Sequence, residues 1–133
     1  MTYDLGWYTE KYVLYLRLPE NPSMEEFDDI NQEITSILAN SSITLSIIID
    51  TNKLKTGYHT ATYLRNTQKY MNHPKLDNIY VVANNKLNRL IMTLGFSLCR
   101  AHFIQFENFK ALENTLIKTG YYPTGTGLNF VNK

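Results

Sequence analysis

The sequence lacks the marks of several protein classes. Its single cysteine, Cys99, excludes an internal disulfide and fits a reducing compartment. No apolar run approaches the roughly 20 residues that a membrane span needs. The first residues hold no basic segment followed by an apolar one, so we expect no signal peptide and a cytoplasmic protein.

An excess of charge of one sign is also lacking. The chain has 13 Lys and Arg against 12 Asp and Glu, a formal net charge of +1, and we interpret acids and bases as well mixed. Surfaces for nucleic acid or anionic membranes usually need a clustered basic patch. We therefore expect neither partner.

What is present is enough for one domain. The 133 residues are 44% hydrophobic, which supports a core without disulfides. Periodic segments fill residues 1–119, which we expect to be a single domain. Residues 120–133 have no periodicity and are expected to be an irregular tail.

Strand and helix patterns alternate along the chain. Two short strands, 3–8 and 12–18, predict an antiparallel hairpin. Ser23 and Glu26 form a capping-box pattern that begins the first helix. The expected elements after that helix are strand 43–50, helix 58–72, strand 79–83, a helix with Leu87, Leu90, Ile91, Leu94 and Leu98 on one face, strand 102–106, and a helix from Phe109 that ends at Gly120.

This ββαβαβαβα order predicts an α/β fold. The sheet is expected to have five strands, mixed but mostly parallel, and to start with the antiparallel hairpin. Right-handed crossovers that step the same way along a sheet put their helices on one face, so we expect the four helices mainly there. The second face then carries mixed and aromatic residues. We expect the chain itself or a partner to cover it in part.

Three segments of the chain resemble the STAS-like (SpoIIAA-like) domains, the anti-sigma-factor antagonist fold. They are the apolar strand ITLSIIID that ends at Asp50, the phrase HPKLDNIYVVANNKLNRLIMTL, and the closing HFIQFENFKALENTLI. The resemblance spans most of residues 7–118. It implies a protein that acts by contact with other proteins, and in some members a switch by phosphorylation at the start of the helix after the central strand. Other relatives bind lipids or nucleotides.

The switch motif of that family reads roughly D-S-S-G, and this chain departs from it. The matching region is Lys55-Thr56-Gly57-Tyr58-His59-Thr60, without the Asp before the acceptor. Thr56 and Thr60 are the hydroxyls near the expected place. A helix N-terminus would stabilise a phosphate there, whereas the alternative is an ordinary capping or turn hydroxyl.

The carboxyl end of the 43–50 strand is the first place to look for function, because parallel sheets place functional groups there. Asp50, Thr56, Tyr58, His59 and Thr60 are the candidate residues for a partner-binding or switch loop. The alternative for Asp50 is a carboxylate that accepts backbone N–H groups in its own loop.

Metal, cofactor and nucleophile patterns are weak. Cys99 and His102 have C-x-x-H spacing, but a zinc site needs two further ligands, and the other histidines form no matching cluster. The glycines of the tail lack the strand, Lys and helix of a phosphate-binding loop. No nucleophile pairs with a base at an interpretable spacing. We expect no metal, no cofactor and no enzyme activity.

Ten tyrosines and one tryptophan are unusual for this length. Trp7, Tyr12 and Tyr15 crowd the N-terminal hairpin. They either cover a half-buried sheet or form an interface, since Tyr and Trp are enriched at binding hot spots.

Two functional hypotheses follow. The first is a non-enzymatic regulatory module that binds another protein, alone or as a homodimer. The second is a carrier of a small apolar ligand or lipid, with a pocket beside the 57–72 helix, whose weak amphipathicity would let it open.

Overall fold

The computed structural model describes residues 3–55 and 59–125 of the chain, and for His59 the backbone only. The strands are β1 (Asp4–Thr9), β2 (Val13–Arg17), β3 (Leu45–Asp50), β4 (Leu76–Val82) and β5 (His102–Phe106). The helices are α1 (Met24–Asn40), α2 (His59–Thr67), the 3₁₀ helix η1 (Lys69–Asn72), α3 (Lys86–Phe96) and α4 (Phe109–Thr119).

The five strands form one sheet in the order β1-β2-β3-β4-β5. β1 pairs antiparallel with β2, and the other neighbours pair parallel. This confirms the predicted α/β fold with a mixed, mostly parallel sheet that starts with a hairpin. The parallel arrangement brings the carboxyl ends of β2, β3 and β4 to one edge, with Asp50 level with Arg17 and Val82.

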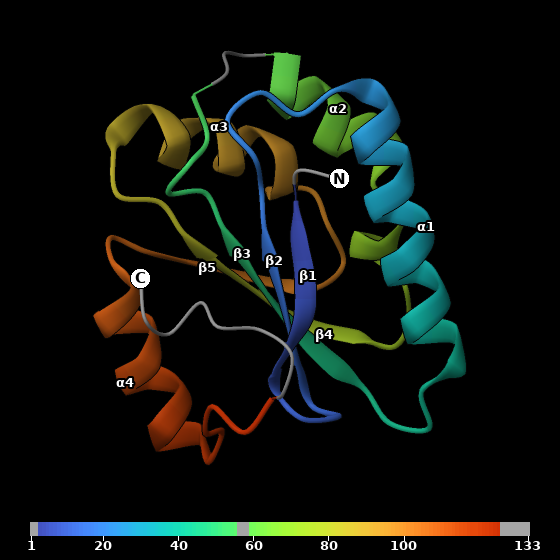
Figure 1. Ribbon diagram of the computed structural model, residues 1–133, viewed down its shortest axis with the longest axis vertical. Helices are drawn as coiled ribbons and strands as arrows, with labels where there is room; N and C mark the ends of the chain where they lie inside the picture. The colour runs from blue at the N-terminus through green and yellow to red at the C-terminus, as the bar shows by residue number, and fades with distance from the viewer. Residues whose placement is uncertain (1–2, 56–58, 126–133) are drawn as a thin grey trace.

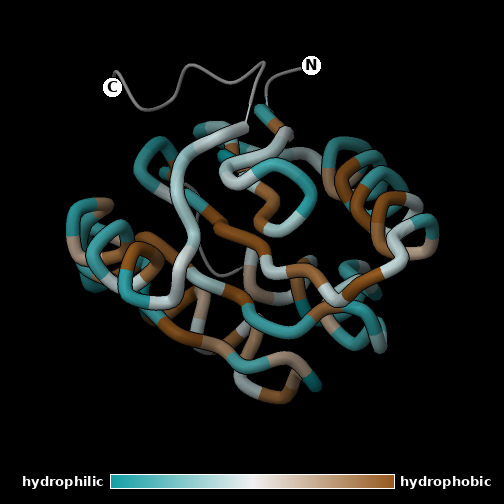
Figure 2. Tube along the Cα trace, turned by 90° about the horizontal axis from the view of Figure 1, so that it is seen from below, coloured by the Kyte–Doolittle hydropathy of each residue, from teal (hydrophilic) through white to brown (hydrophobic). Residues whose placement is uncertain are grey.

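The sheet separates two hydrophobic cores. The larger core packs the β2 and β3 residues Leu14, Leu16, Ile47 and Ile49 against α1, α2 and α3. The smaller core lies on the opposite face, where Tyr15, Ile48, Tyr80 and Val82 meet Leu112 and Leu116 of α4. Figure 2 shows the hydrophobic residues of the strands in the middle of the molecule and hydrophilic residues on the outer turns of the helices.

The fourth helix therefore stands apart from the other three, as Figure 1 shows. α1, α2 and α3 each connect two parallel strands and are placed by their crossovers on one face. α4 follows the last strand and connects to no further one, so no crossover constrains it. It covers the aromatic face of the sheet, to which the sequence prediction assigned no helix.

The predicted 58–72 helix is two elements. α2 ends at Thr67, and η1 follows after Gln68. Side chains and backbone of α1 cause the break: Asn31 Oδ1 accepts the backbone N–H of Lys69 at 2.7 Å, and Gln68 Nε2 donates to the Phe27 carbonyl at 3.0 Å. These contacts compete with the i to i−4 bonds that would continue α2.

Residues 121–125 form no helix or strand and return across the smaller core to β1. The N–H of Gly125 donates to the Tyr8 carbonyl at 2.8 Å, and Thr9 Oγ1 donates to the Tyr122 carbonyl at 2.7 Å. Part of the expected irregular tail thus covers the hairpin.

Candidate functional site

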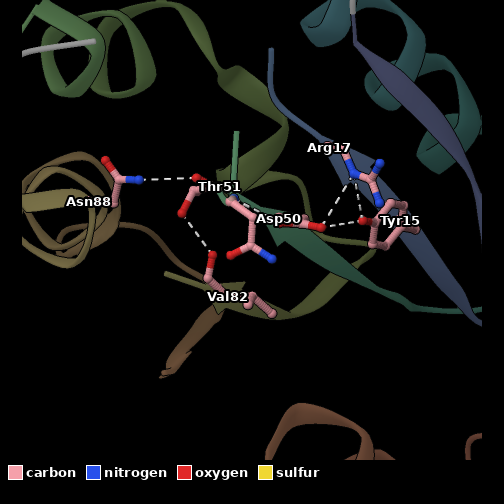
Figure 3. Close-up of polar contacts among 7 residues, drawn as sticks. Tyr15, Arg17, Asp50, Thr51, Val82 and Asn88 are labelled. Atoms are coloured by element: carbon pink, nitrogen blue, oxygen red, sulfur yellow. Dashed lines mark hydrogen bonds and ion pairs between the residues drawn. The ribbon is translucent and has the colours of Figure 1, made fainter. Parts of the chain in front are cut away.

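The loop that follows β3 is held by hydrogen bonds on two sides. Asp50 Oδ1 accepts the backbone N–H of Asn52 at 2.9 Å, and Thr51 Oγ1 donates to the Val82 carbonyl at 2.8 Å. From α3, the amide of Asn88 donates to the Thr51 carbonyl at 3.0 Å and to the Leu54 carbonyl at 3.2 Å. Figure 3 shows the bonds from Asn88 to Thr51 and from Thr51 to Val82 on its left, and Asp50 with Tyr15 and Arg17 on its right.

Asp50 also belongs to a buried cluster with Tyr15 and Arg17. The Tyr15 hydroxyl donates a hydrogen bond to Asp50 Oδ2 and accepts one from Arg17 Nε at 3.1 Å. Arg17 Nε lies 3.5 Å from Asp50 Oδ2, and both side chains are less than a tenth exposed. The cluster closes the carboxyl end of β2 and β3 on the α4 side.

The electrostatics of this cluster favour a structural role. Burial, and then the carboxylate of Asp50, raise the pKa of Tyr15 far above its usual value, so the hydroxyl stays protonated and cannot serve as a base. Burial opposes the charge on Arg17, but the contacts with Tyr15 and Asp50 outweigh it and raise the pKa of the guanidinium. Asp50 thus has its backbone N–H partner and an ion pair, and it is 3% exposed.

The other predicted loop residues are not gathered around Asp50. Thr56 and Tyr58 lie outside the described residues. His59 begins α2, and its side chain is likewise outside the description. Thr60 is fully buried, and its hydroxyl has no hydrogen-bond partner among the described residues. A kinase could reach Thr60 only if α2 moved.

The hairpin aromatics divide into two groups. Trp7 and Tyr12 line a groove of about 640 Å³ between the hairpin and the end of α1, together with Lys11, Ile37 and Ile43. Tyr15 is fully buried in the smaller core and presents no surface here.

α3 and the turn that follows it carry exposed apolar residues. The helix buries Asn88, Ile91, Met92, Gly95 and Phe96. The residues Leu87, Leu90, Leu94 and Leu98 are 47%, 44%, 38% and 82% exposed, and we name them the leucine stripe. The spacing of Leu87, Leu90 and Leu94 puts them on one side of α3, and Leu98 follows in the turn after the helix ends at Phe96. The sequence pattern grouped these four leucines with Ile91 on one face, and of that set the structure buries only Ile91.

The leucine stripe borders a shallow groove between two helices. Leu94 lines it with Ala61, Thr62, Arg65 and Asn66 of α2, and the volume is about 290 Å³. The Arg65 guanidinium crosses to the other wall and donates to the Leu94 carbonyl. We name this groove, together with the leucine stripe that adjoins it at Leu94, the α2–α3 groove.

Although the net charge is near zero, acidic and basic residues are concentrated in different parts of the chain. Residues 1–50 contain nine Asp and Glu against two Lys and Arg. Residues 51–106 contain eight Lys and Arg against one acid, Asp77. Because the strand order follows the sequence, the acidic half of the sheet and α1 lie on one side and the basic half with α2 and α3 on the other. The interpretation of well-mixed charges is therefore wrong.

Within residues 3–55 and 59–125, no three His, Cys, Asp or Glu side chains gather closely enough to hold a metal ion. Cys99 donates to the Ala101 carbonyl at 3.2 Å, and burial raises the pKa of its thiol. Across the same residues no helix is both long and apolar enough to span a membrane.

Comparisons with protein-family models, with curated proteins and with solved structures find no match to this chain. The resemblance to STAS-like domains therefore remains a proposal.

Sequence reasoning missed Asn88 and the leucine stripe. A signal for the stripe was present, because apolar residues surround α3 on more than one side, and a helix needs only one apolar stripe to pack on a sheet. Nothing in the sequence marked Asn88 as buried.

Proposed function

We propose that this chain is a non-enzymatic regulatory module that binds another protein through the α2–α3 groove. The observation that carries the proposal is the leucine stripe. Single exposed apolar residues are common, but contiguous apolar patches on a soluble domain usually mark an interaction surface. Four leucines in one row, each more than a third exposed, form such a patch.

The surroundings of the groove support a binding role. Asn88 ties α3 to the loop after β3, and Gly95 lets α3 pack closely on α2. Both walls are therefore fixed before a partner arrives, which lowers the entropy cost of association. The resemblance to STAS-like domains points the same way, since its members mostly act by protein contact. A half-buried single thiol fits a reducing compartment, and we propose a cytoplasmic location.

The carrier hypothesis gains less support. The groove beside α2 is shallow, holds about 290 Å³ and has the exposed Arg65 in its lining. Sites that enclose a drug-sized apolar ligand usually have volumes of about 300–1,000 Å³ and bury most of the ligand surface. A lipid chain would remain largely in water here.

Site-specific photo-crosslinking tests the proposed function. A photoreactive amino acid at position 98, in the leucine stripe, and one at position 117 on α4 are compared in cells that express the chain. Ile117 is 46% exposed and serves as the matched control. We expect a discrete crosslinked protein from position 98 alone, and its loss when Leu90→Ser is added. The same products from both positions would refute the proposal.

A further inference from the structure

We propose that the partner of the α2–α3 groove is an acidic, amphipathic helix of another protein. The inference rests on the proposed function, because it names the chemistry of whatever binds that groove. It is carried by the charges around the leucine stripe and by the shape of the groove.

Four exposed cations lie on the elements that form or adjoin the groove, and of these Lys69 lies next to Asn31 of α1. Arg65 lies in the groove, Lys69 follows α2, Lys86 begins α3 and Arg100 follows it. The backbone N–H of Arg100 donates to Asn72 Oδ1 at 2.8 Å, which places Arg100 beside η1 at the far end of the groove. Cations thus stand at both ends and in the middle.

These cations have no carboxylate partner among the described residues. The ion pairs there are Arg17 with Asp50 and Lys55 with Glu20. α2 and α3 contain no Asp or Glu. The acidic helix α1 packs against η1, where Lys69 lies, but it is separated from α3 by α2, which packs against both. Charges more than about 8–10 Å apart are largely screened at physiological salt, so the groove presents a positive, apolar surface.

A second copy of this chain fits the groove poorly. A symmetric contact would place the same cations opposite one another, and like charges across an interface are strongly unfavourable. The acidic helix α1 of another copy offers carboxylates, but Met24 at its first turn is its one large hydrophobic residue that is exposed. It therefore has no apolar row to match the leucine stripe.

A helix fits the geometry of the groove. The leucines within α3, Leu87 to Leu94, extend over seven residue steps, which is about 10 Å along a helix axis, or two turns, and Leu98 continues the stripe in the turn beyond. An amphipathic helix presents apolar residues at the same three- and four-residue spacing and binds grooves in this way. Its carboxylates would meet Arg65 in the groove and Arg100 beyond the C-terminal end of α3.

Peptide selection tests the inference. A displayed library of random 16-residue peptides is selected on the full chain, and binders are titrated by fluorescence anisotropy against variants. The Leu90→Ser/Leu98→Ser variant removes apolar surface. The Lys69→Glu/Arg100→Glu variant reverses charge beside the groove, and Lys110→Glu/Lys118→Glu reverses charge on α4 as the matched control.

We expect binders rich in Asp and Glu with apolar residues at helical spacing. Reversal of Lys69 and Arg100 should weaken them about tenfold, and the α4 reversal should change affinity by less than about twofold. Arg65→Gln adds a single change inside the groove. Circular dichroism of each variant ensures that a loss of binding is not a loss of folding.

Other outcomes separate the two proposals. Binders that need the leucines but show no acidic excess, and that tolerate Lys69→Glu/Arg100→Glu, would overturn the acidic partner and leave the proposed function standing. Binders that ignore Leu90→Ser/Leu98→Ser would overturn both. A single-stranded DNA oligonucleotide that binds with the leucines removed, and is lost on charge reversal, would assign the cations to nucleic acid and also overturn the inference.

Discussion

The Cβ atom that Gly95 lacks would lie 3.0 Å from the Cβ atom of Leu64. Gly95 is in α3 and Leu64 in α2, and both are buried. The missing side chain lets the two helices approach closely and so sets the depth of the α2–α3 groove. This close approach is the reason for a glycine within a helix, where it otherwise costs roughly 1 kcal/mol relative to alanine.

Gly95→Ala should therefore destabilise the protein in spite of its better helix propensity. We expect a loss of about 1–2 kcal/mol, because the new methyl group must push Leu64 and α2 outward. Urea denaturation measures the change, with Asn114→Ala on the exposed side of α4 as the control. A gain of stability in Gly95→Ala would show that Leu64 gives way at no cost.

Asp50→Asn should be more damaging than its small change of shape suggests. It leaves the charge of Arg17 buried without a counter-charge, and breaking a buried pair in this way typically costs about 3–5 kcal/mol. The double variant Arg17→Met/Asp50→Asn removes both charges and should recover most of that loss. If the double variant is less stable than Asp50→Asn, the stranded charge is not the cause.

Tyr15 and Tyr70 allow a comparison of how a bonded and an unbonded buried hydroxyl affect the free energy of unfolding. Tyr70 is fully buried, and its hydroxyl has no hydrogen-bond partner among the described residues. Tyr70→Phe should raise the free energy of unfolding by about 1 kcal/mol, because it removes an unsatisfied polar group. Tyr15→Phe should lower it by about 1–2 kcal/mol, because it breaks the bonds to Asp50 and Arg17. Urea denaturation of both variants would show opposite signs; equal signs would contradict this account.

The sheet order and most elements were predictable because local signals agree with the global fold. Ser23 and Glu26 do form the capping box that begins α1, and Gly120 ends α4 in the left-handed conformation. Apolar runs at regular intervals were enough to place the strands. The break at Gln68 was not predictable, since it depends on Asn31, 38 residues from Lys69 in the sequence.

The candidate site was predictable only in part. Asp50 lies at the strand end as expected, but its partners Tyr15 and Arg17 come from another strand. In α3, the buried and the exposed sets both have helical spacing, so periodicity cannot choose between them. The choice depends on the close approach of Leu64 to Gly95 and on the loop carbonyls that Asn88 binds.

The leucine stripe should contribute little to folding. We expect Leu90→Ser/Leu98→Ser to lower the free energy of unfolding by less than about 1 kcal/mol, because much of both side chains is already in water. Ile91→Ala, at a fully buried position of the same helix, should cost about 2–5 kcal/mol. Thermal denaturation of the two variants compares the faces directly. Equal losses would mean that the leucines pack as core residues.

Alkaline pH should destabilise this protein through its tyrosines. Burial is the largest cause that raises the pKa of Tyr3, Tyr15, Tyr70 and Tyr80, and with Glu113 it raises the pKa of Tyr8 to about 12. In the unfolded chain, tyrosines ionise near pH 10. Above that pH the unfolded state loses protons that the native state keeps, so stability is complete below about pH 10 and falls as the pH rises toward 12.

Urea denaturation at pH 8, 9, 10 and 11 measures this fall. Each such tyrosine contributes a slope of at most about 1.4 kcal/mol per pH unit. Tyr70→Phe removes one contributor and should make the decline shallower. If the free energy of unfolding of Tyr70→Phe falls with pH as steeply as that of the unmodified protein, then Tyr70 has the same pKa in the native and unfolded states. Its burial would then not raise that pKa.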